Sequence, residues 1–429
     1  MQPKDPAGPH RQEDVTRVAH DLVLYGARLL TGADPPTGAA DGWVAVAGGR
    51  VAALGHGVPP DAAERIDVEG DWLVPGFVDV HVHGGAGGDV MAPDRSDRDA
   101  VRRLHARHGT TAMLASTVSR PAGELRDAVA RLAADAAEAA DAADAAESAE
   151  TPPEPIARLV GIHLEGPFLS RVRRGAHQET ALRPPDPAEL DDLLEAGAGL
   201  VRTVTVAPEL PGALDLVRHL ADLGVTAAIG HTDADAATVR EAVRAGARAM
   251  THTFNGMQPL HHRRPGAVGM AMDLPQLTCE LILDLVHVDP VAARALVHAA
   301  GADRICLVTD AMAATGMSDG TYELGGQVVE VVDGRARVSG TSTLAGSTLT
   351  MARAVENAVA HLGIDVPTAV AMATTIPAGL LHGVDVGRLH ADGPADLVRL
   401  DDLAHLRGVW ISGHAIDTVD PTPKEVTGG

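Results

Sequence analysis

The sequence predicts an α/β protein: a (β/α)8 TIM-like barrel with a small β-sandwich domain built from both chain ends. Three observations predict it. Apolar strand-like segments alternate with helical segments through the middle of the chain, which is the pattern of parallel βαβ units. The strand candidates in this middle part number eight, the strand count of such a barrel. Short β-type segments separated by Gly and Asp turns flank the middle at both ends.

Composition excludes several classes of function. The 429 residues are 45% hydrophobic and 22% charged, as in ordinary globular proteins. A net charge of −23 argues against nucleic acid as a partner, because its phosphates would be repelled. No apolar run approaches the roughly 20 residues of a membrane span, and the first residues hold no apolar secretion signal or anchor. Cys279 and Cys306 lie in apolar runs, as reduced buried thiols do. We expect a cytoplasmic protein that binds neither nucleic acid nor membrane.

The domains follow from these patterns in chain order. Residues 1–18 are polar and rich in Pro and charge, so we expect a disordered extension. Residues 19–70 and 384–420 carry the short β-type segments and are expected to form the β-sandwich domain. Residues 71–383 are expected to form the barrel.

The barrel strands are expected where apolar runs stand between helical segments. Helices are predicted at 234–245, 290–300, 350–362 and 367–380, and an acidic, Ala-rich segment at 124–150 reads as a solvated helix. A β-hairpin is predicted over 321–339 around an Asp-Gly turn. The eight predicted strands are 73–83, 110–117, 158–165, 201–206, 225–231, 247–253, 278–286 and 304–310.

Residues capable of binding a metal recur near the C-terminal ends of these strands. In a barrel those ends meet at one mouth, where barrel enzymes do their chemistry. Any one of these residues has an ordinary alternative: a histidine can bond a backbone carbonyl, and an aspartate can cap a helix. Their recurrence at five strands favours a common site. The residues are His81, His83, Glu165, His231, His252 and Asp310, with His163 left unassigned.

Imidazole and carboxylate ligands suit a divalent transition metal, with zinc expected first and iron, cobalt or manganese as alternatives. Glu165, His231 and His252 can hold such an ion and leave a position for water, whose pKa the metal lowers. Asp310 can then act as general base and, towards a leaving amine, as general acid. The strand ends therefore predict metal-assisted hydrolysis of an amide-like bond.

The segment VPGFVDVHVHG, followed by these barrel-end residues, resembles the amidohydrolase superfamily. The motifs GIHLEGPF, RGAHQ, IGHTDAD, THTFNGM, LILDLVHV, LVTDAMAATG and STLAGS, in order between about residues 20 and 415, resemble the N-acetylglucosamine-6-phosphate deacetylase family. The resemblance implies a homodimer that hydrolyses N-acetyl-D-glucosamine 6-phosphate to D-glucosamine 6-phosphate and acetate.

The resemblance also implies roles for individual residues. Asp310 and His177 would be catalytic. Some members of the family replace the His-x-His pair and bind one metal, so His81 and His83 in this sequence allow a second cation and one or two metal ions per chain. His287 would reach the phosphate in the neighbouring active site. Substrate binding would fall to Ala176, His177, Asn255, Gly256, Arg263, Asp284, His287, Leu344, Ala345 and Gly346.

Charged residues narrow the alternatives. Lysine occurs only at Lys4 and Lys424, so relatives that bridge two metals with a carboxylated barrel lysine are excluded. The cluster at 261–264 is compact and basic and could bind phosphate, although a solvated turn is the alternative. Another deacylase or deaminase, acting on N-acetylgalactosamine 6-phosphate or an N-acyl amino acid, and a non-catalytic metal-binding barrel remain as alternative functions.

Overall fold

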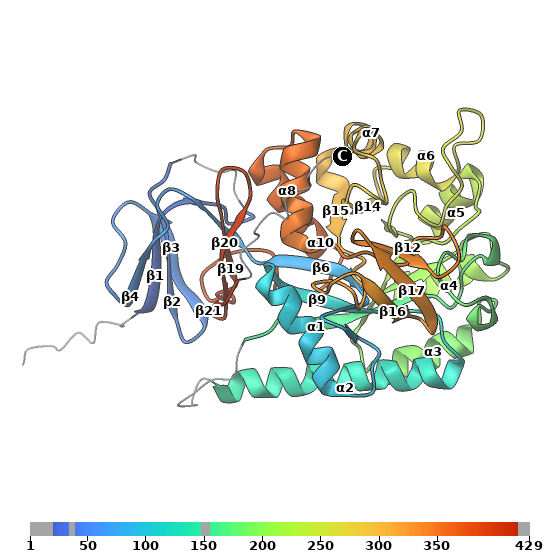
Figure 1. Cartoon of the computed structure of the whole chain (residues 1–429), viewed down its shortest axis with the longest axis horizontal. Helices are drawn as coiled ribbons and strands as arrows, with labels where there is room; N and C mark the ends of the chain where they lie inside the picture. The colour runs from blue at the N-terminus through green and yellow to red at the C-terminus, as the bar shows by residue number, and fades with distance from the viewer. Residues whose placement is uncertain (1–19, 34–38, 147–154, 419–429) are drawn as a thin grey trace, which may run out of the picture.

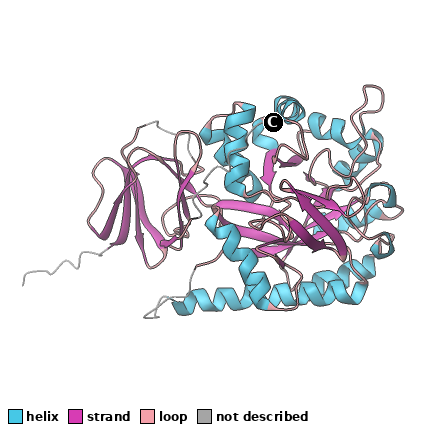
Figure 2. Ribbon diagram, viewed as in Figure 1, coloured by secondary structure: helices cyan, strands magenta, loops and turns pink. Residues whose placement is uncertain are grey.

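A computed structural model describes residues 20–33, 39–146 and 155–418 of the chain. Two sheets organise these residues, a parallel barrel and a smaller sheet beside it (Figure 1). Helices surround the barrel, whereas the smaller sheet is almost all strand and loop (Figure 2). The extension predicted at residues 1–18 lies outside the described residues.

The barrel consists of eight parallel strands in chain order, so the predicted fold class is confirmed. Closure comes from a parallel bridge between Val82 and Ala311, and from the amide of Asp310, which donates to the carbonyl of His81 at 2.9 Å. The strands are buried along their length because helices cover them outside and side chains fill the interior. They are β6 (Phe77–Val82), β9 (Thr110–Thr117), β10 (Arg158–Glu165), β11 (Val201–Val206), β12 (Thr226–Ile229), β13 (Ala249–Met250), β14 (Thr278–Ile282) and β15 (Ile305–Val308).

Helices follow most of the strands and pack their apolar faces onto the barrel. Several begin at an aspartate whose side chain accepts from an amide of the first turn, as Asp235 and Asp289 do. The helices are α1 (Arg95–Arg107), α2 (Ala122–Ala146), α3 (Pro187–Ala196), α4 (Ala213–Asp222), α5 (Ala236–Ala245), α6 (Gly266–Asp273), α7 (Pro290–Ala300), α8 (Met351–Leu362), α9 (Val366–Ala373) and α10 (Thr375–Ala378).

Helix α2 corresponds to the acidic segment predicted at 124–150, whose last residues lie outside the described ranges. The prediction of a solvated helix does not hold for its first turns, which are partly buried. Leu125, Val129 and Leu132 are buried against the barrel, so the amphipathic half of the helix anchors it. Among the helices in the described ranges, none is both long and apolar enough to cross a bilayer.

The smaller sheet joins segments from both chain ends, and its core includes Leu24, Val44, Leu397 and Trp410. Its strands are β1 (His20–Leu29), β2 (Gly42–Ala47), β3 (Arg50–His56), β4 (Ala62–Asp67), β5 (Trp72–Pro75), β19 (Leu397–Leu400), β20 (Leu406–Ile411) and β21 (His414–Ile416).

The first barrel strand differs from its prediction at 73–83. Residues 72–75 form β5, which pairs with β1 and β19 in the smaller sheet, and only β6 belongs to the barrel. The chain changes sheets at Gly76, where a Cβ would lie 2.1 Å from Oγ1 of Thr111, so this close passage needs a glycine. We therefore propose that the barrel begins at Gly76 rather than at residue 71.

The hairpin predicted at 321–339 has a third strand. Strands β16 (Gly320–Leu324), β17 (Gln327–Val332) and β18 (Arg335–Val338) form an antiparallel meander that lies over the barrel mouth (Figure 1). The predicted turn at Asp333-Gly334 joins β17 and β18, and a Gly325-Gly326 turn, which the prediction did not separate, joins β16 and β17. A two-stranded ribbon of β7 (Gly84–Gly85) and β8 (Gly88–Asp89) follows β6.

Candidate active site

Three polar side chains at the barrel mouth follow their strands in a strained backbone conformation. His231, His252 and Asp310 each lie two residues beyond a strand and have φ angles of 45°, 27° and 50°. Such left-handed angles cost a non-glycine residue about 1–3 kcal/mol and concentrate at functional sites. The conformation ends each strand and turns its side chain into the mouth, which explains why β12 and β13 are shorter than predicted.

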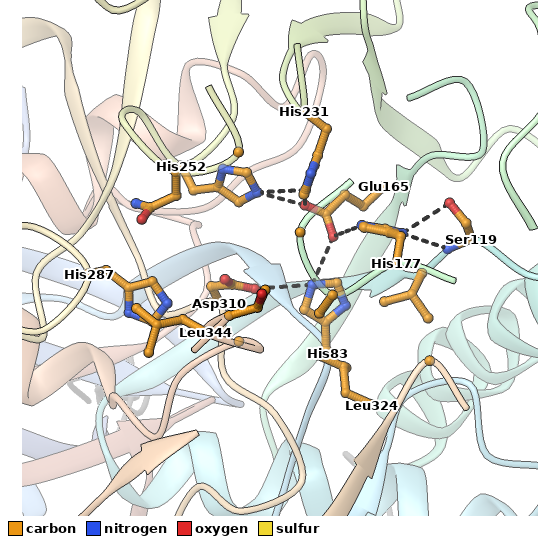
Figure 3. A pocket seen from close by; sticks show the side chains of 18 of the residues that line it. His83, Ser119, Glu165, His177, His231, His252, His287, Asp310, Leu324 and Leu344 are labelled. Atoms are coloured by element: carbon orange, nitrogen blue, oxygen red, sulfur yellow. Dashed lines mark hydrogen bonds and ion pairs between the residues drawn. The ribbon is translucent and has the colours of Figure 1, made fainter. Parts of the chain in front are cut away.

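Glu165, the last residue of β10, meets the first two of these side chains. Its Oε1 lies 3.1 Å from Nε2 of His231 and 2.9 Å from Nε2 of His252, and these two nitrogens are 3.1 Å apart (Figure 3). All three residues are at least 95% buried. One carboxylate oxygen and two ring nitrogens therefore converge on one point.

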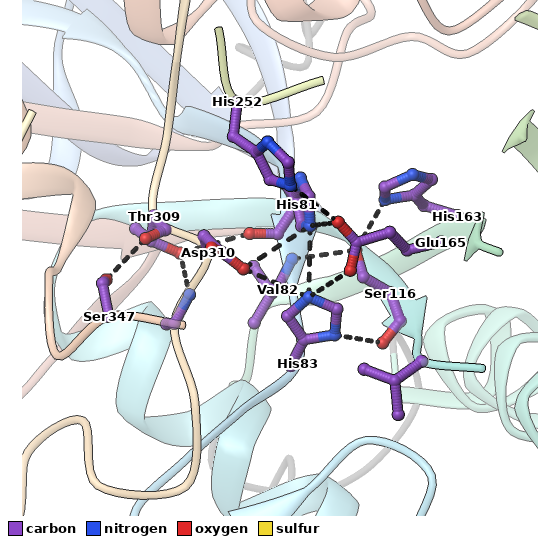
Figure 4. Close-up of polar contacts among 12 residues, drawn as sticks. His81, Val82, His83, Ser116, His163, Glu165, His252, Thr309, Asp310 and Ser347 are labelled. Carbon is purple, nitrogen blue, oxygen red and sulfur yellow. Dashed lines mark hydrogen bonds and ion pairs between the residues drawn. The ribbon is translucent and has the colours of Figure 1, made fainter. Parts of the chain in front are cut away.

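A second group lies on the other side of the same carboxylate. Nε2 of His83 is 3.3 Å from Oε2 of Glu165 and 3.1 Å from Oδ1 of Asp310. Nε2 of His81 is 3.1 Å from Nε2 of His83 and 3.5 Å from both Oε1 of Glu165 and Oδ1 of Asp310 (Figure 4). Glu165 thus faces both groups: Oε1 lies near His231, His252 and His81, and Oε2 lies near His83.

The hydrogen bonds made by Nδ1 show which nitrogen of each histidine lacks a hydrogen and can bind a metal. Nδ1 of His83 donates to the carbonyl of Ser116 at 2.9 Å, and Nδ1 of His231 donates to the carbonyl of Arg173 at 2.8 Å. Nδ1 of His81 donates to Oε2 of Glu280 at 3.0 Å. Because Nδ1 carries the hydrogen in these rings, each neutral ring turns a bare Nε2 towards the centre, the arrangement of metal-binding histidines.

The charge balance of this centre fits a bound cation. Burial lowers the pKa of His83, but hydrogen bonds to Asp310 and Glu165 outweigh burial and raise it to about 9. Burial raises the pKa of Asp310, yet His81 and His83 hold it at about 2. Nitrogens and carboxylate oxygens that crowd together in this way need protons or metal ions between them. Among the described residues, two groups have ligand atoms within 4.8 Å of one another: His81, His83 and Asp310, and Glu165, His177 and His231.

His163, which the sequence left unassigned, does not face this centre. Its Nδ1 lies 3.0 Å from Oγ of Ser116, and its Nε2 lies 2.8 Å from Oγ1 of Thr205. Its ring packs edge-on against the ring of His81, with ring centroids 4.6 Å apart. His163 therefore supports the ring of His81 from inside the barrel.

A cavity of about 290 Å³ opens beside the centre. The structure brings many of the sequence-predicted residues to its wall: His83, Glu165, Ala176, His177, His231, His252, Asn255, Gly256, His287, Asp310, Leu344 and Gly346. Asn255 supplies a buried side-chain nitrogen with no partner among the described residues, so this donor is available to a ligand.

Four other sequence-predicted residues do not line the cavity. His81 lies behind His83, and Ala345 is fully buried between its cavity-lining neighbours. Asp284 accepts a hydrogen bond from Nδ1 of His287 at 2.7 Å, so it holds the ring of a residue that lines the cavity. Arg263 is exposed on the loop between β13 and α6 and is not among the residues that line the cavity.

Sequence reasoning missed several residues of the site, some in the cavity wall and one, Glu280, behind the ring of His81. Ser119 follows β9 as the predicted ligands follow their strands, so the same rule could have found it. Glu280 lies inside an apolar strand, and an isolated acidic residue at such a position was the signal from which its role could have been predicted. Leu324 and Gly325 come from the meander, and only the fold brings them here.

The family comparison agrees with this arrangement. The amidohydrolase family model matches residues 72–423, well over half of the chain. The chain belongs to the amidohydrolase family. This amidohydrolase is 37% identical over 400 residues to an N-acetylgalactosamine-6-phosphate deacetylase of Escherichia coli O157:H7, covering 91% of this chain and 98% of the relative. It is 38% identical over 317 residues to the N-acetylglucosamine-6-phosphate deacetylase of Bacillus subtilis, covering 72% of this chain and 76% of the relative.

Solved structures give the same picture for this amidohydrolase. A mutant N-acetyl-D-glucosamine-6-phosphate deacetylase from Mycobacterium smegmatis, in complex with N-acetyl-D-glucosamine-6-phosphate, matches with a TM-score of 0.83 and 40% identity. The match covers 93% of this chain and all of the other. The family resemblance drawn from the sequence motifs is therefore confirmed.

Proposed function

We propose that this amidohydrolase hydrolyses the N-acetyl amide of N-acetyl-D-glucosamine 6-phosphate, giving D-glucosamine 6-phosphate and acetate. One observation carries the proposal. Glu165, His231 and His252 meet within 3.1 Å of one another beside Asp310, on the wall of a cavity of about 290 Å³. Relatives 37–40% identical to the chain are deacetylases of amino-sugar 6-phosphates.

The centre fits one or two divalent transition metal ions. Glu165, His231 and His252 would hold one ion, and His81 and His83 would hold a second that shares Glu165. Imidazole and carboxylate donors favour zinc, with iron, cobalt and manganese as alternatives. When bound, such a metal polarises the amide carbonyl and makes a water molecule more acidic.

Asp310 is placed to move the proton. Its carboxylate is buried at the cavity wall and held by His83 at 3.1 Å, so its position is defined. With its pKa held at about 2, it is ionised at neutral pH and can accept a proton from the attacking water. It then delivers that proton to the amine that leaves as the amide C–N bond breaks.

Other cavity residues would bind the sugar. Asn255 offers its unpartnered side-chain amide, and His177 offers a ring nitrogen at the carboxylate of Glu165. The carboxylate of Asp284 holds the ring of His287 and, against the effect of burial, raises the pKa of that ring, which favours contact with an anionic substrate. Leu344 and Gly346 would close over the ligand.

The position of the predicted phosphate-binding residues bears on the oligomeric state. His287 lines the cavity of its own chain, whereas Arg263 is exposed and outside it. We therefore propose a homodimer in which Arg263 reaches the phosphate bound by a neighbouring chain. The family resemblance implies that His287 reaches the phosphate in the neighbouring active site, although His287 lines the cavity of its own chain. The two free cysteines are both buried, which supports the cytoplasm as the proposed compartment.

The second candidate substrate is N-acetyl-D-galactosamine 6-phosphate, favoured by the relative that matches over 98% of its length. Acetate release from the two phosphosugars and from unphosphorylated N-acetyl-D-glucosamine tests the choice. The proposal expects kcat/KM to be highest for N-acetyl-D-glucosamine 6-phosphate. A higher value for the galacto epimer would reverse the assignment, and equal values with and without phosphate would remove phosphosugars as the substrate class.

A further inference from the structure

Ser119 lies at the wall of the cavity, two residues beyond the end of β9, and is 1% exposed. It makes two contacts with one atom of His177. Its backbone amide lies 3.2 Å from Nδ1 of His177, and its hydroxyl oxygen lies 3.0 Å from the same nitrogen. Figure 3 shows Ser119 on the outer side of the His177 ring, with Glu165 on the inner side.

The backbone amide decides the direction of these bonds. A peptide N–H can only donate, so Nδ1 of His177 must be the acceptor and must carry a lone pair. A neutral imidazole with a bare Nδ1 has its hydrogen on Nε2. That Nε2 lies 3.3 Å from Oε2 of Glu165 and faces the cavity. His177 therefore presents an N–H group where His81, His83 and His231 present a lone pair.

The contrast with the neighbouring rings is direct. His83 and His231 each donate from Nδ1 to a backbone carbonyl, which leaves Nε2 bare. His177 accepts at Nδ1 instead, although its Nε2 lies as near to Glu165 as the Nε2 of His83 does. Proximity alone makes His177 a candidate metal ligand, whereas its hydrogen bonds make it a donor.

The surroundings keep Ser119 in this position. A Cβ at Gly166 would lie 2.2 Å from Oγ of Ser119, so the glycine leaves the space that the hydroxyl occupies. The loop that carries His177 is held from the other side, because the side-chain amide of Gln327 donates to the carbonyl of Ala176 at 2.7 Å. The ring and its two donors are thus packed from both directions.

We propose that Ser119 is a positioning residue that holds His177 as the Nε2–H tautomer, so that His177 donates to the substrate and does not bind metal. The use of this donor in the reaction rests on the proposed function. A donor fixed at the cavity wall can bond the acetyl oxygen and stabilise the negative charge that gathers there as water adds to the amide carbon. The tautomer itself is a property of the substrate-free protein.

Nitrogen-15 NMR of histidine-labelled, metal-loaded protein tests the tautomer directly. The spectrum of a His177→Gln variant identifies the His177 signals by difference, and metal analysis of that variant accompanies it. We expect a protonated Nε2 and a bare Nδ1 for His177, and an unchanged metal content in the variant. A protonated Nδ1, a metal-shifted Nε2 or a lost metal ion would overturn the proposal. None of these readings depends on the substrate, so a wrong substrate assignment leaves them unaffected.

Kinetics test the hydroxyl separately. Ser119→Ala keeps the amide and removes one donor to Nδ1. We expect kcat to fall by about 3- to 10-fold, the effect of one neutral hydrogen bond, with KM and metal content unchanged. Ser119→Thr keeps the hydroxyl and should recover most of that loss. An unchanged kcat in the Ala variant, a Thr variant no better than Ala, or a loss of metal together with kcat would overturn the role of the hydroxyl.

Discussion

The carboxylate of Glu280 accepts a hydrogen bond from Nδ1 of His81 at 3.0 Å. The same oxygen accepts from the backbone amide of His252 at 3.1 Å, so one buried side chain connects the two halves of the proposed metal centre. A carboxylate behind a metal-binding histidine fixes the ring and makes its other nitrogen a better donor. Glu280 is therefore expected to control metal binding without touching the metal.

Replacing Glu280 with Gln should weaken metal binding about 10- to 100-fold, the usual effect of losing such a partner. Titration of metal-free protein with zinc, followed by calorimetry, measures it. Glu64→Gln is the matched control, because Glu64 is exposed on β4 of the smaller sheet. Equal zinc affinity in the two variants would remove Glu280 from the metal centre.

Replacing both His81 and His83 with Ala should remove about one metal equivalent per chain, because Glu165, His231 and His252 still provide the three protein ligands of a typical catalytic site. Metal analysis of the purified double variant measures the stoichiometry. If both variant and parent carry the same amount of metal, the pair serves the structure and holds no second ion.

Asp310→Asn should fold and bind metal but lose about 10²- to 10⁴-fold in kcat, since the amide cannot take up the proton from water. Acetate release gives kcat, and thermal unfolding with metal analysis controls for structure. An Asp310→Asn enzyme with kcat close to that of the parent would exclude Asp310 as the general base.

Arg263→Ala should raise KM for the phosphorylated sugar far more than for the unphosphorylated sugar, because only the phosphate contact is lost. The exposed position of Arg263 adds a second expectation. Mixed dimers of the Arg263→Ala chain and the Asp310→Asn chain should recover activity, since one site then receives both intact residues. Failure of the mixed dimers to recover activity would argue against an arginine supplied by the neighbouring chain.

His105 gives the protein a predictable pH dependence of stability. The ring is fully buried and Nε2 donates to the carbonyl of Gly84. Burial lowers the pKa of His105 from 6.5 to about 4, and that hydrogen bond opposes the shift only in part. Because the folded pKa is depressed, the unfolded chain binds the proton first. Stability is therefore complete above pH 6.5 and is lost as the pH falls towards 4.

The loss amounts to about 3 kcal/mol if this ring alone is considered. His105→Gln keeps a donor for Gly84 and removes the titration. Denaturant unfolding across this pH range should give a flatter curve for the variant than for the parent. Parallel curves would mean that other groups account for the acid sensitivity.

The sequence predicted most of the barrel because its strands are apolar runs bounded by polar residues. Strands β9, β10 and β11 have the predicted bounds. The first strand was predicted wrongly because its apolar pattern continues through Pro75 and Gly76, while the chain passes from one sheet to the other. Strand β13 ends early because His252 has a left-handed backbone conformation. The sequence does not reveal such a conformation when the residue is not a glycine.

The candidate site was predictable where it follows the strand ends, as with Glu165 and His231. Ser119 has the same kind of position, two residues beyond β9, but the prediction considered only residues capable of binding a metal and therefore passed over a serine. Arg263 was expected at the substrate because of its charge, and charge does not reveal that its side chain is exposed and does not line the cavity of its own chain.

The most direct test follows both products of the proposed reaction in one sample. Protein is stripped of metal with a chelator, divided, and half is reloaded with zinc before N-acetyl-D-glucosamine 6-phosphate is added. The account predicts equal amounts of acetate and D-glucosamine 6-phosphate from the reloaded half and almost none from the stripped half. Absence of acetate at every loading of zinc, iron, cobalt or manganese would contradict it.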